Sequence, residues 1–463
     1  MTESEAPVDV ETAEETLTEP LLSDDVPEEV ESASRQGTTA SARFNILSTM
    51  VGGGSLSLPL AFQKSGALLG PLILLFIAGV TYFCFGMLIA SARLLSPPTA
   101  ETNGKDSFES ITAAAFGNRA HTFSKALVIF MCFFGTVGYA VLLRDMLEPI
   151  QQAVWDPRVT FVARNWTMWS VVVLVTPLCT LRTLTALQRF GAFSMFSIVV
   201  LGVCIVYRST ECNVHHPLHI QWFPDSWKDV LDAFPLFVSC YVCHYNIPTV
   251  HNELRQPSEG RVRWWLQSTT LSATVFYLIM GIAGSAYAPC TADGHVQGNI
   301  LLDMDPKDPL LLVGRMCLAV TVTLAFPMLT IPARDILLRS RQEQSTTITT
   351  EGEGSAPEDQ VASDDDETLE TTWKERLSVA TVVLWLATLL ASCVDSIDIV
   401  WDLLGSSLSM LLSYLIPAAS YLVIVLYTEA EASRWSLWGA SVLLVVTLPL
   451  MVISTINAIY NTV

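Results

Sequence analysis

Long apolar segments separated by short polar stretches dominate the pattern of hydrophobic and polar positions along this chain. A transmembrane helix needs about 20 mainly apolar residues to cross the hydrocarbon core of a bilayer. Eleven segments approach or exceed that length, at approximately residues 42–63, 67–94, 121–148, 166–181, 187–208, 232–252, 263–288, 309–338, 375–394, 399–427 and 434–460. The pattern predicts an all-α protein that crosses a membrane eleven times.

The first segment contains residues that a continuous helix disfavours. Gly52, Gly53 and Gly54 follow one another, and each costs about 1 kcal/mol relative to alanine in a helix. Pro59 removes a further backbone donor. We therefore predict a broken helix, which is tolerated at membrane depth only where the freed backbone groups are buried in protein or face a wet cavity. A glycine seam for close helix packing is the alternative interpretation.

A break of this kind is a candidate binding site because it frees backbone groups of both polarities. A half-helix that starts near Ser55 would point the N–H groups of Gly53, Gly54 and Ser55 toward a carboxylate. The carbonyls released between Thr49 and Gly52 would face an ammonium group or a metal cation. Together these two ends suit a zwitterionic amino acid.

The sixth segment is interrupted as well. The run CHYN at residues 243–246 lies mid-span, and Pro248 follows it. Two interrupted segments that stand five apart are what two inverted halves, segments one to five and six to ten, would produce. We therefore expect both breaks to face one site near the midplane, where the backbone around Ser239, Cys240 and Cys243 would help to bind the ammonium group.

Four side chains near these breaks have two interpretations each. His244 could carry a proton or orient the unwound backbone, whereas a neutral histidine bonded to a backbone group would give the same sequence. Tyr139 could line a cavity through its hydroxyl or simply pack. Thr321 and Thr323 could complete an oxygen shell for a hard cation such as sodium, or bond to their own helix.

Composition agrees with a membrane protein, since 51% of the residues are hydrophobic and 15% are charged. The formal net charge of −20 comes from two segments: residues 1–40 hold 12 acidic residues and one arginine, and residues 340–372 hold 10 and one. Both are poor in aromatic residues, which predicts a disordered acidic tail and a disordered acidic inner loop. The charge therefore says nothing about the substrate. The tail is a candidate docking segment for a cytoplasmic protein.

The distribution of basic residues predicts the topology. If the N-terminus is cytoplasmic, 17 of the 25 lysines and arginines fall on the cytoplasmic side, which supports a cytoplasmic N-terminus and an outer or lumenal C-terminus. We expect helices one to five in 41–210, an outer loop in 211–231, helices six to ten in 232–427, and helix eleven with the C-terminus in 428–463. A short interfacial helix is expected within residues 106–118.

Two cysteines stand apart from the other eight. Cys212 and Cys290 fall in the two outer loops that flank segments six and seven, whereas the others lie in or near spans. Both would face an oxidising space, so we predict that they form a disulfide.

The segments described so far carry a resemblance to a known family. The chain resembles the amino acid/auxin permease family, and most closely its branch of sodium-coupled neutral amino acid transporters. The resemblance rests on FNILSTMVGGGSLSLPLAF at 44–62, SFESITAAAFGN at 107–118, FPLFVSCYVCHYNIPTVHNEL at 234–254 and DPLLLVGRMCLAVTVTLAFPMLTIPARDIL at 308–337. It implies eleven helices with a five-plus-five inverted repeat of the amino acid-polyamine-organocation type, and substrate held between helices one and six with three and eight alongside.

The resemblance also bears on ion coupling. Relatives in this branch often carry a polar amide four residues before the first glycine of the break, where this chain has Ser48. Asn45 lies nearly one turn earlier, and Thr323 matches the position in helix eight that looks like a cation ligand. Sodium and protons both stay open as coupling ions. The candidate residues for the coupling ion are Asn45, Ser48, Val51, Thr321, Thr323 and His244.

These observations predict a secondary active transporter of neutral amino acids in the plasma membrane or in a lysosomal or vacuolar membrane. Segments one, three, six and eight hold no aspartate or glutamate mid-span, so nothing there would pair with the second positive charge of lysine or arginine. The alternative is a membrane sensor that binds an amino acid and signals through its acidic tail. We find no catalytic dyad, nucleophile motif or metal-ligand spacing within the spans, which argues against an enzyme. We expect no bound cofactor other than a coupling sodium ion or proton, and no nucleic-acid partner.

Overall fold

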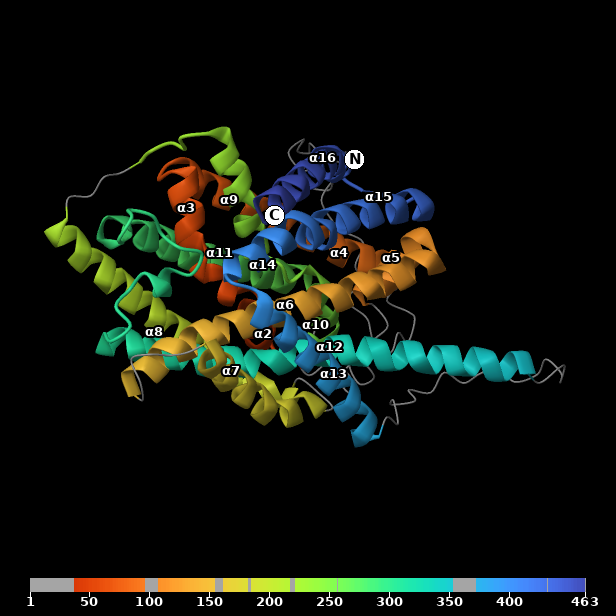
Figure 1. Ribbon diagram of the computed structural model, residues 1–463. Coiled ribbons are helices and arrows are strands. Elements are labelled where there is room, and N and C mark those ends of the chain that lie inside the picture. The colour runs from red at the N-terminus through yellow and green to blue at the C-terminus, as the bar shows by residue number, and fades with distance from the viewer. Residues whose placement is uncertain are drawn as a thin grey trace, which may run out of the picture.

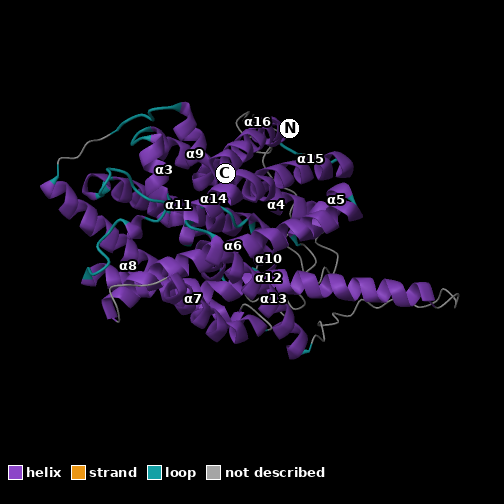
Figure 2. Ribbon diagram, in the orientation of Figure 1, coloured by secondary structure: helices purple, strands orange, loops and turns teal. Residues whose placement is uncertain are grey.

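The computed structural model describes residues 37–95, 107–154, 161–181, 185–216, 221–255, 257–352, 372–430 and 432–462. Within these residues the secondary structure is helical (Figure 2), and the one β-type pairing is an isolated bridge between Gly37 and Leu254. The expected acidic tail therefore lies almost wholly outside the described residues.

The helices follow the predicted apolar segments closely. In chain order they are α2 (Thr39–Met50), α3 (Leu58–Ser65), α4 (Leu69–Leu95), α5 (Phe108–Phe116), α6 (Asn118–Val154), α7 (Phe161–Val175), α8 (Thr185–His215), α9 (Trp227–Ser239), α10 (Ile247–Glu253), α11 (Glu259–Ser285), α12 (Pro309–Gly352), α13 (Trp373–Cys393), α14 (Ile397–Leu404), α15 (Ile416–Thr428) and α16 (Arg434–Thr462).

Among the described residues, nine helical segments are long and apolar enough to cross a membrane. The first and fourth predicted segments are not among these nine. The first consists of α2 and α3, and the fourth of α7 with a 3₁₀ turn at Thr176–Thr180. The chain is therefore a multi-pass, all-α membrane protein. Eleven crossings and the inverted repeat stay predictions.

Both predicted breaks are present. α2 ends at Met50, a 3₁₀ turn covers Gly53–Leu56, and α3 begins at Leu58 with Pro59 in its first turn, where its missing N–H has no partner to lose. α9 ends at Ser239, and α10 begins at Ile247 after a 3₁₀ turn.

Two expected boundaries were wrong. The inner loop was expected to be disordered from residue 340, but α12 continues to Gly352 and projects beyond the other helices (Figure 1). No proline interrupts the chain between Pro332 and Pro357, so the backbone bonds of the helix can continue past its apolar part; residues 353–371 lie outside the described residues. The outer loop was expected from residue 211, but α8 runs to His215.

The short helix expected near residues 106–118 is confirmed as α5. Ser107 caps it, accepting a hydrogen bond from the backbone N–H of Ser110 at 3.2 Å while the Ser110 hydroxyl accepts one from the backbone N–H of Ser107 at 2.8 Å. Phe108 and Ile111 are buried and Phe116 is exposed. These reciprocal bonds satisfy two backbone donors at the start of the helix.

A buried arginine, Arg144, links two helices by capping the end of one of them. Arg144 of α6 donates to the carbonyl oxygens of Ala391, Val394 and Asp395 at the end of α13, at 2.8–3.0 Å. The last carbonyls of a helix lack intrahelical partners and carry negative partial charge. A buried guanidinium is therefore tolerated at this position, and it fixes α13 against α6.

Candidate functional site

Two of the three glycines at the first break, Gly52 and Gly53, are required by close neighbours rather than by backbone conformation. Gly52 has φ −125°, and none of the three is among the described glycines with positive φ. A Cβ atom on Gly52 would overlap the hydroxyl oxygen of Tyr139, and one on Gly53 would lie 2.8 Å from Leu142 Cδ2. The break is thus packed directly against α6.

A cavity lies beside this break, between α2, α6, α8 and α12. Its lining includes several residues that the sequence singled out, namely Ser48, Val51, Gly52, Gly53, Tyr139 and Thr321. The remaining lining is mostly apolar: Ser194, Ile198, Leu318, Val322, Leu324, Ala325 and Met328. None of these described lining residues carries a charge. Apolar walls with a few polar groups have the chemistry of a small-molecule site, although the volume of about 20 Å³ has room for water only, so the cavity must widen to admit an amino acid.

The backbone groups at the first break are only partly free. The N–H of Ser55 donates to the carbonyl of Gly52 at 3.2 Å, and its hydroxyl donates to the same carbonyl at 2.8 Å. In this state the Ser55 N–H is therefore engaged within the break, because the 3₁₀ turn starts at Gly53, two residues earlier than expected. Gly53 and Gly54 form the first positions of that turn, where N–H groups have no intrahelical partner.

The two breaks lie against each other, but the second one does not reach the cavity. A Cβ atom on Gly54 would lie 3.5 Å from Cys240 Sγ and 3.9 Å from Ser239 Oγ. Ser239, Cys240 and Cys243 are not among the residues that line the cavity. In this state the second break therefore backs the first one, rather than forming the opposite wall of one shared cavity.

The candidates for a coupling ion separate into two groups. Thr321 lines the cavity, and its hydroxyl is buried without a hydrogen-bond partner among the described residues. Thr323 donates to the carbonyl of Ala319 in its own helix at 2.6 Å and does not line the cavity. Thr321 therefore has free oxygen lone pairs at the cavity, whereas Thr323 follows the alternative interpretation of a threonine bonded to its own helix.

The helix before the break supplies the remaining candidates. The hydroxyls of Ser48 and Thr49 both donate to the carbonyl of Asn45 at 2.9 Å. Ser48 lines the cavity together with Val51, and neither Asn45 nor Thr49 does. Because its hydrogen is used by the helix, the Ser48 oxygen could act toward the cavity only as an acceptor.

His244 lies away from the cavity in an aromatic environment. Its ring is fully buried, 4.6 Å from the ring centre of Phe85 and 5.9 Å from that of Tyr414. Neither ring nitrogen has a hydrogen-bond partner among the described residues. Of the two interpretations that the sequence left open for His244, the histidine bonded to a backbone group is not seen in this state.

Sequence reasoning missed two aromatic residues at the breaks. Trp401 of α14 packs its ring edge-on to Tyr139, with centroids 6.2 Å apart, and its Cζ2 would lie 3.4 Å from a Cβ atom on Gly53. The hydroxyl of Tyr277 in α11 lies within hydrogen-bond distance of one carbonyl oxygen of each break. Neither residue stands in a motif, so the only available signal was the presence of a polar aromatic residue within an apolar segment.

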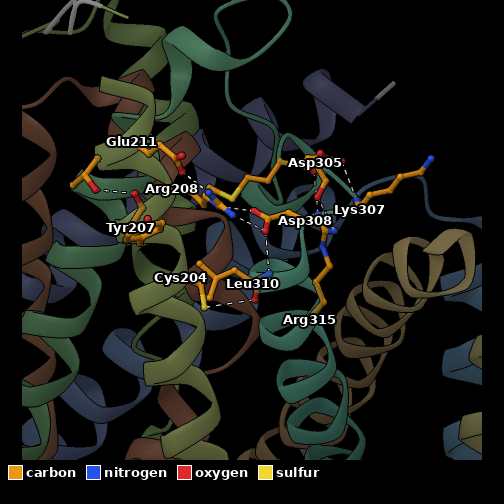
Figure 3. A network of polar contacts seen from close by, with 11 residues as sticks. Cys204, Tyr207, Arg208, Glu211, Asp305, Lys307, Asp308, Leu310 and Arg315 are labelled. Carbon is orange, nitrogen blue, oxygen red and sulfur yellow. Dashed lines mark hydrogen bonds and ion pairs between the residues drawn. The ribbon is translucent and has the colours of Figure 1, made fainter. Parts of the chain in front are cut away.

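Ion pairs at one end of the bundle hold two walls of the cavity together (Figure 3). Arg208 of α8 forms a two-pronged pair with Asp308, with Nε–Oδ2 and Nη2–Oδ1 distances of 2.5 and 2.7 Å, and it also pairs with Glu211. Asp308 in turn accepts the N–H of Leu310 at 3.0 Å in the first turn of α12. The carboxylate thus joins α8 to the start of α12.

The pKa of Asp308 reflects these bonds. Burial acts to raise it, but the hydrogen bonds from Arg208 and from the backbone of α12 outweigh burial and hold the pKa below its ordinary value. The predicted disulfide is present nearby, with a Cα–Cα distance of 6.1 Å between Cys212 and Cys290. Cys212 lies in the last turns of α8 rather than in a loop, and the disulfide fastens that end of α8 to the segment that follows α11.

Comparisons with known proteins extend over nearly the whole chain. Residues 35–460 match the family model described as transmembrane amino acid transporter protein. Vacuolar amino acid transporter 5 of Schizosaccharomyces pombe is 25% identical over 383 residues, which cover 82% of this chain and 83% of that protein. A Bos taurus protein, provisionally named sodium-coupled neutral amino acid transporter 11, is 24% identical over 387 residues, which cover 83% of this chain and 75% of that protein.

A solved structure supports the fold. The crystal structure of MhsT in complex with L-phenylalanine superimposes with a TM-score of 0.55, covering 92% of this chain and 99% of the other, at 10% identity. At that identity the likeness concerns the arrangement of the helices alone.

Proposed function

Because this chain belongs to the transmembrane amino acid transporter family, we propose that it moves neutral amino acids across a membrane by alternating access. The observation that carries the proposal is the meeting of two helix breaks beside a cavity: Gly54 of the first break lies against Cys240 of the second, and Gly52 and Gly53 line the cavity. Broken helices that meet within the membrane provide backbone donors and acceptors for a zwitterion without a charged side chain.

The carboxylate of the substrate would accept hydrogen bonds from the N–H groups of Gly53 and Gly54, at the positive end of the half-helix that leads into α3. The ammonium group would be held by carbonyls near the end of α2, and by those from Ser239 to Cys243 once the second break, which lies outside the cavity in this state, moves to face it. The substrate side chain would extend along Ile198, Val322 and Met328, with Tyr139 setting its size. The absence of charge among the described lining residues supports a neutral side chain.

We further propose that a coupling cation binds between Ser48, the Val51 backbone and Thr321. All three line the cavity, and the Thr321 hydroxyl is buried there without a hydrogen-bond partner among the described residues. Hard cations such as sodium prefer hydroxyl and carbonyl oxygens. Proton coupling through His244 is the competing proposal, supported by a buried imidazole without a partner in the described part of the chain.

The state described here would be one end of the transport cycle. The breaks are in contact and the cavity lies between α2, α6, α8 and α12, so the other end would require the helices with the breaks to rock against their neighbours. The vacuolar name of one relative supports an intracellular compartment such as a vacuole or lysosome. Imaging of tagged protein beside markers of the vacuole or lysosome and of the plasma membrane would test that location.

Reconstituted vesicles would test the transport proposal directly. Uptake of labelled glutamine, alanine, asparagine, leucine and arginine would be measured with a sodium gradient and a pH gradient imposed separately, beside empty vesicles. Uptake of the neutral amino acids above that of arginine supports the proposal. Saturable binding with no flux under either gradient would reject it and favour a sensor.

Matched variants would identify the coupling ion. Thr321→Val replaces the hydroxyl with a methyl group of similar size, and Thr323→Val makes the same change at a hydroxyl that bonds its own helix. If sodium is coupled at the cavity, Thr321→Val removes the sodium dependence and Thr323→Val keeps it. Uptake driven only by pH, and lost in His244→Gln, would instead support proton coupling.

A further inference from the structure

One side chain from a third helix contacts both breaks. Tyr277 lies within α11 and is fully buried. Its hydroxyl oxygen lies 2.8 Å from the carbonyl oxygen of Met50, the last residue of α2, and 2.7 Å from that of Cys240, which caps the end of α9. Both distances are those of good hydrogen bonds.

The hydroxyl of Tyr277 faces more acceptors than it has hydrogens. A tyrosine hydroxyl has one hydrogen, and it faces two carbonyl oxygens. The N–H of Gly52 also donates to the Met50 carbonyl, at 3.0 Å. The Cys240 carbonyl has Tyr277 as its donor, and we find no second one in the described part of the chain. The hydroxyl of Tyr277 therefore ties the end of α9 to the end of α2.

We propose that Tyr277 is a positioning residue for substrate recognition, which sets the spacing of the carbonyls that receive the ammonium group of the amino acid. The inference rests on the proposed transport function. Tyr277, Met50 and Cys240 all lie outside the lining of the cavity. Tyr277 therefore acts by fixing how the two breaks lie against each other, and the two carbonyls would meet the ammonium group only when the breaks move to face the cavity. Any movement of α2 relative to α9 must break one of its two contacts, which couples the two breaks.

Removal of the hydroxyl should loosen this geometry. In Tyr277→Phe the buried Cys240 carbonyl loses its donor, and an unsatisfied buried carbonyl draws toward any other donor that it can reach. The two carbonyls are then no longer held at a fixed spacing. The site then binds an ammonium group less tightly, because its hydrogens no longer meet acceptors at fixed positions. The site also discriminates less between an ammonium group and one that carries fewer hydrogens.

Tyr241 provides a matched control. Its side chain is fully buried, its ring packs edge-on to that of Tyr277 with centroids 5.2 Å apart, and its hydroxyl bonds to Thr274 Oγ1 at 2.8 Å. Tyr241→Phe therefore removes a buried, bonded hydroxyl from the same aromatic pair. It leaves the Met50 and Cys240 carbonyls with their donors.

The test compares uptake of a neutral amino acid with uptake of its N-methylated form in reconstituted vesicles. Tyr277→Phe should raise KM for the unmethylated amino acid roughly fivefold to tenfold, the equivalent of one hydrogen bond. KM for the N-methylated form should rise less, because that form already offers one hydrogen fewer. The KM of the N-methylated form divided by the KM of the unmethylated form should therefore fall in Tyr277→Phe. In Tyr241→Phe this ratio should stay at the wild-type value.

A second pair of variants keeps the test decisive if Tyr277→Phe does not fold. Tyr277→4-aminophenylalanine retains a para donor, and Tyr277→4-methylphenylalanine fills the same space without one. The amino variant should keep the wild-type KM ratio and the methyl variant should lower it. An equal ratio in all variants, with normal wild-type uptake, overturns this inference alone. Absence of wild-type uptake overturns the proposed function and this inference with it.

Discussion

The contact between Gly52 and Tyr139 gives a sharp test of the packing at the first break. Gly52 has φ −125° and ψ −148°, which is not the left-handed region that favours glycine. A cost of Gly52→Ala would therefore be steric. The added methyl group would overlap the Tyr139 hydroxyl oxygen and would lie 3.2 Å from Tyr139 Cζ. Either Tyr139 turns away or the end of α2 shifts.

Overpacking of this kind costs about 1–3 kcal/mol. Tyr139→Phe removes the overlapping atom, after which Cζ at 3.2 Å is the nearest, a contact that yields with a shift of a few tenths of an ångström. The double variant should therefore be more stable than Gly52→Ala alone, with a favourable coupling of roughly 1–2 kcal/mol. Gly79→Ala in α4 is the control, because no atom lies within 4 Å of its added Cβ.

Unfolding of the four purified proteins of this cycle, and of the Gly79→Ala control, would be measured in the same detergent. Gly79→Ala should be as stable as the wild type or up to about 1 kcal/mol more stable, because alanine is the better helix former. The reasoning is refuted if Gly52→Ala behaves like Gly79→Ala. It is equally refuted if the effects of Gly52→Ala and Tyr139→Phe add within about 0.5 kcal/mol, since residues in contact should not be additive.

Three further predictions concern the break, the ion pair and the disulfide. Gly53→Leu should abolish uptake while the protein remains folded, because even a Cβ atom there lies 2.8 Å from Leu142, whereas Gly54→Ala, whose Cβ would lie 3.5 Å from Cys240 Sγ, should keep most of it; equal uptake by both variants would contradict the site. Asp308→Asn should lower stability at pH 7 by roughly 1–2 kcal/mol. Because the pKa of Asp308 is lowered from 3.8, the stabilisation by its carboxylate is present above pH 3.8 and is lost as the pH falls through the lowered pKa. Melting curves of the two proteins should therefore converge on acidification, and a constant gap between them would be evidence against the ion pair. Cys212 and Cys290 close a loop with a sequence separation of 78, so replacing both with serine should cost about 4 kcal/mol, and mass spectrometry that finds two free thiols without reduction would disprove the bond.

Local sequence determined much of this protein. The apolar segments gave the positions of the helices, since a span must be long and apolar whatever it packs against. The glycine run and the CHYN run gave the two breaks, because backbone propensity is a local property. The outer cysteines gave the disulfide. The inner loop shows the limit of such reasoning, since acidic composition predicted disorder where α12 continues to Gly352.

Tertiary packing decided which residues meet, because the rotation of a helix about its axis and its neighbours are not local properties. Thr321 and Thr323 look equivalent in the sequence, yet two residues along a helix point to nearly opposite sides, and only Thr321 reaches the cavity. Gly52 and Gly53 are needed because Tyr139 and Leu142 of another helix take up the space that a side chain would fill. The bridge from Tyr277 to both breaks requires three helices at once, so no pattern along the chain could reveal it.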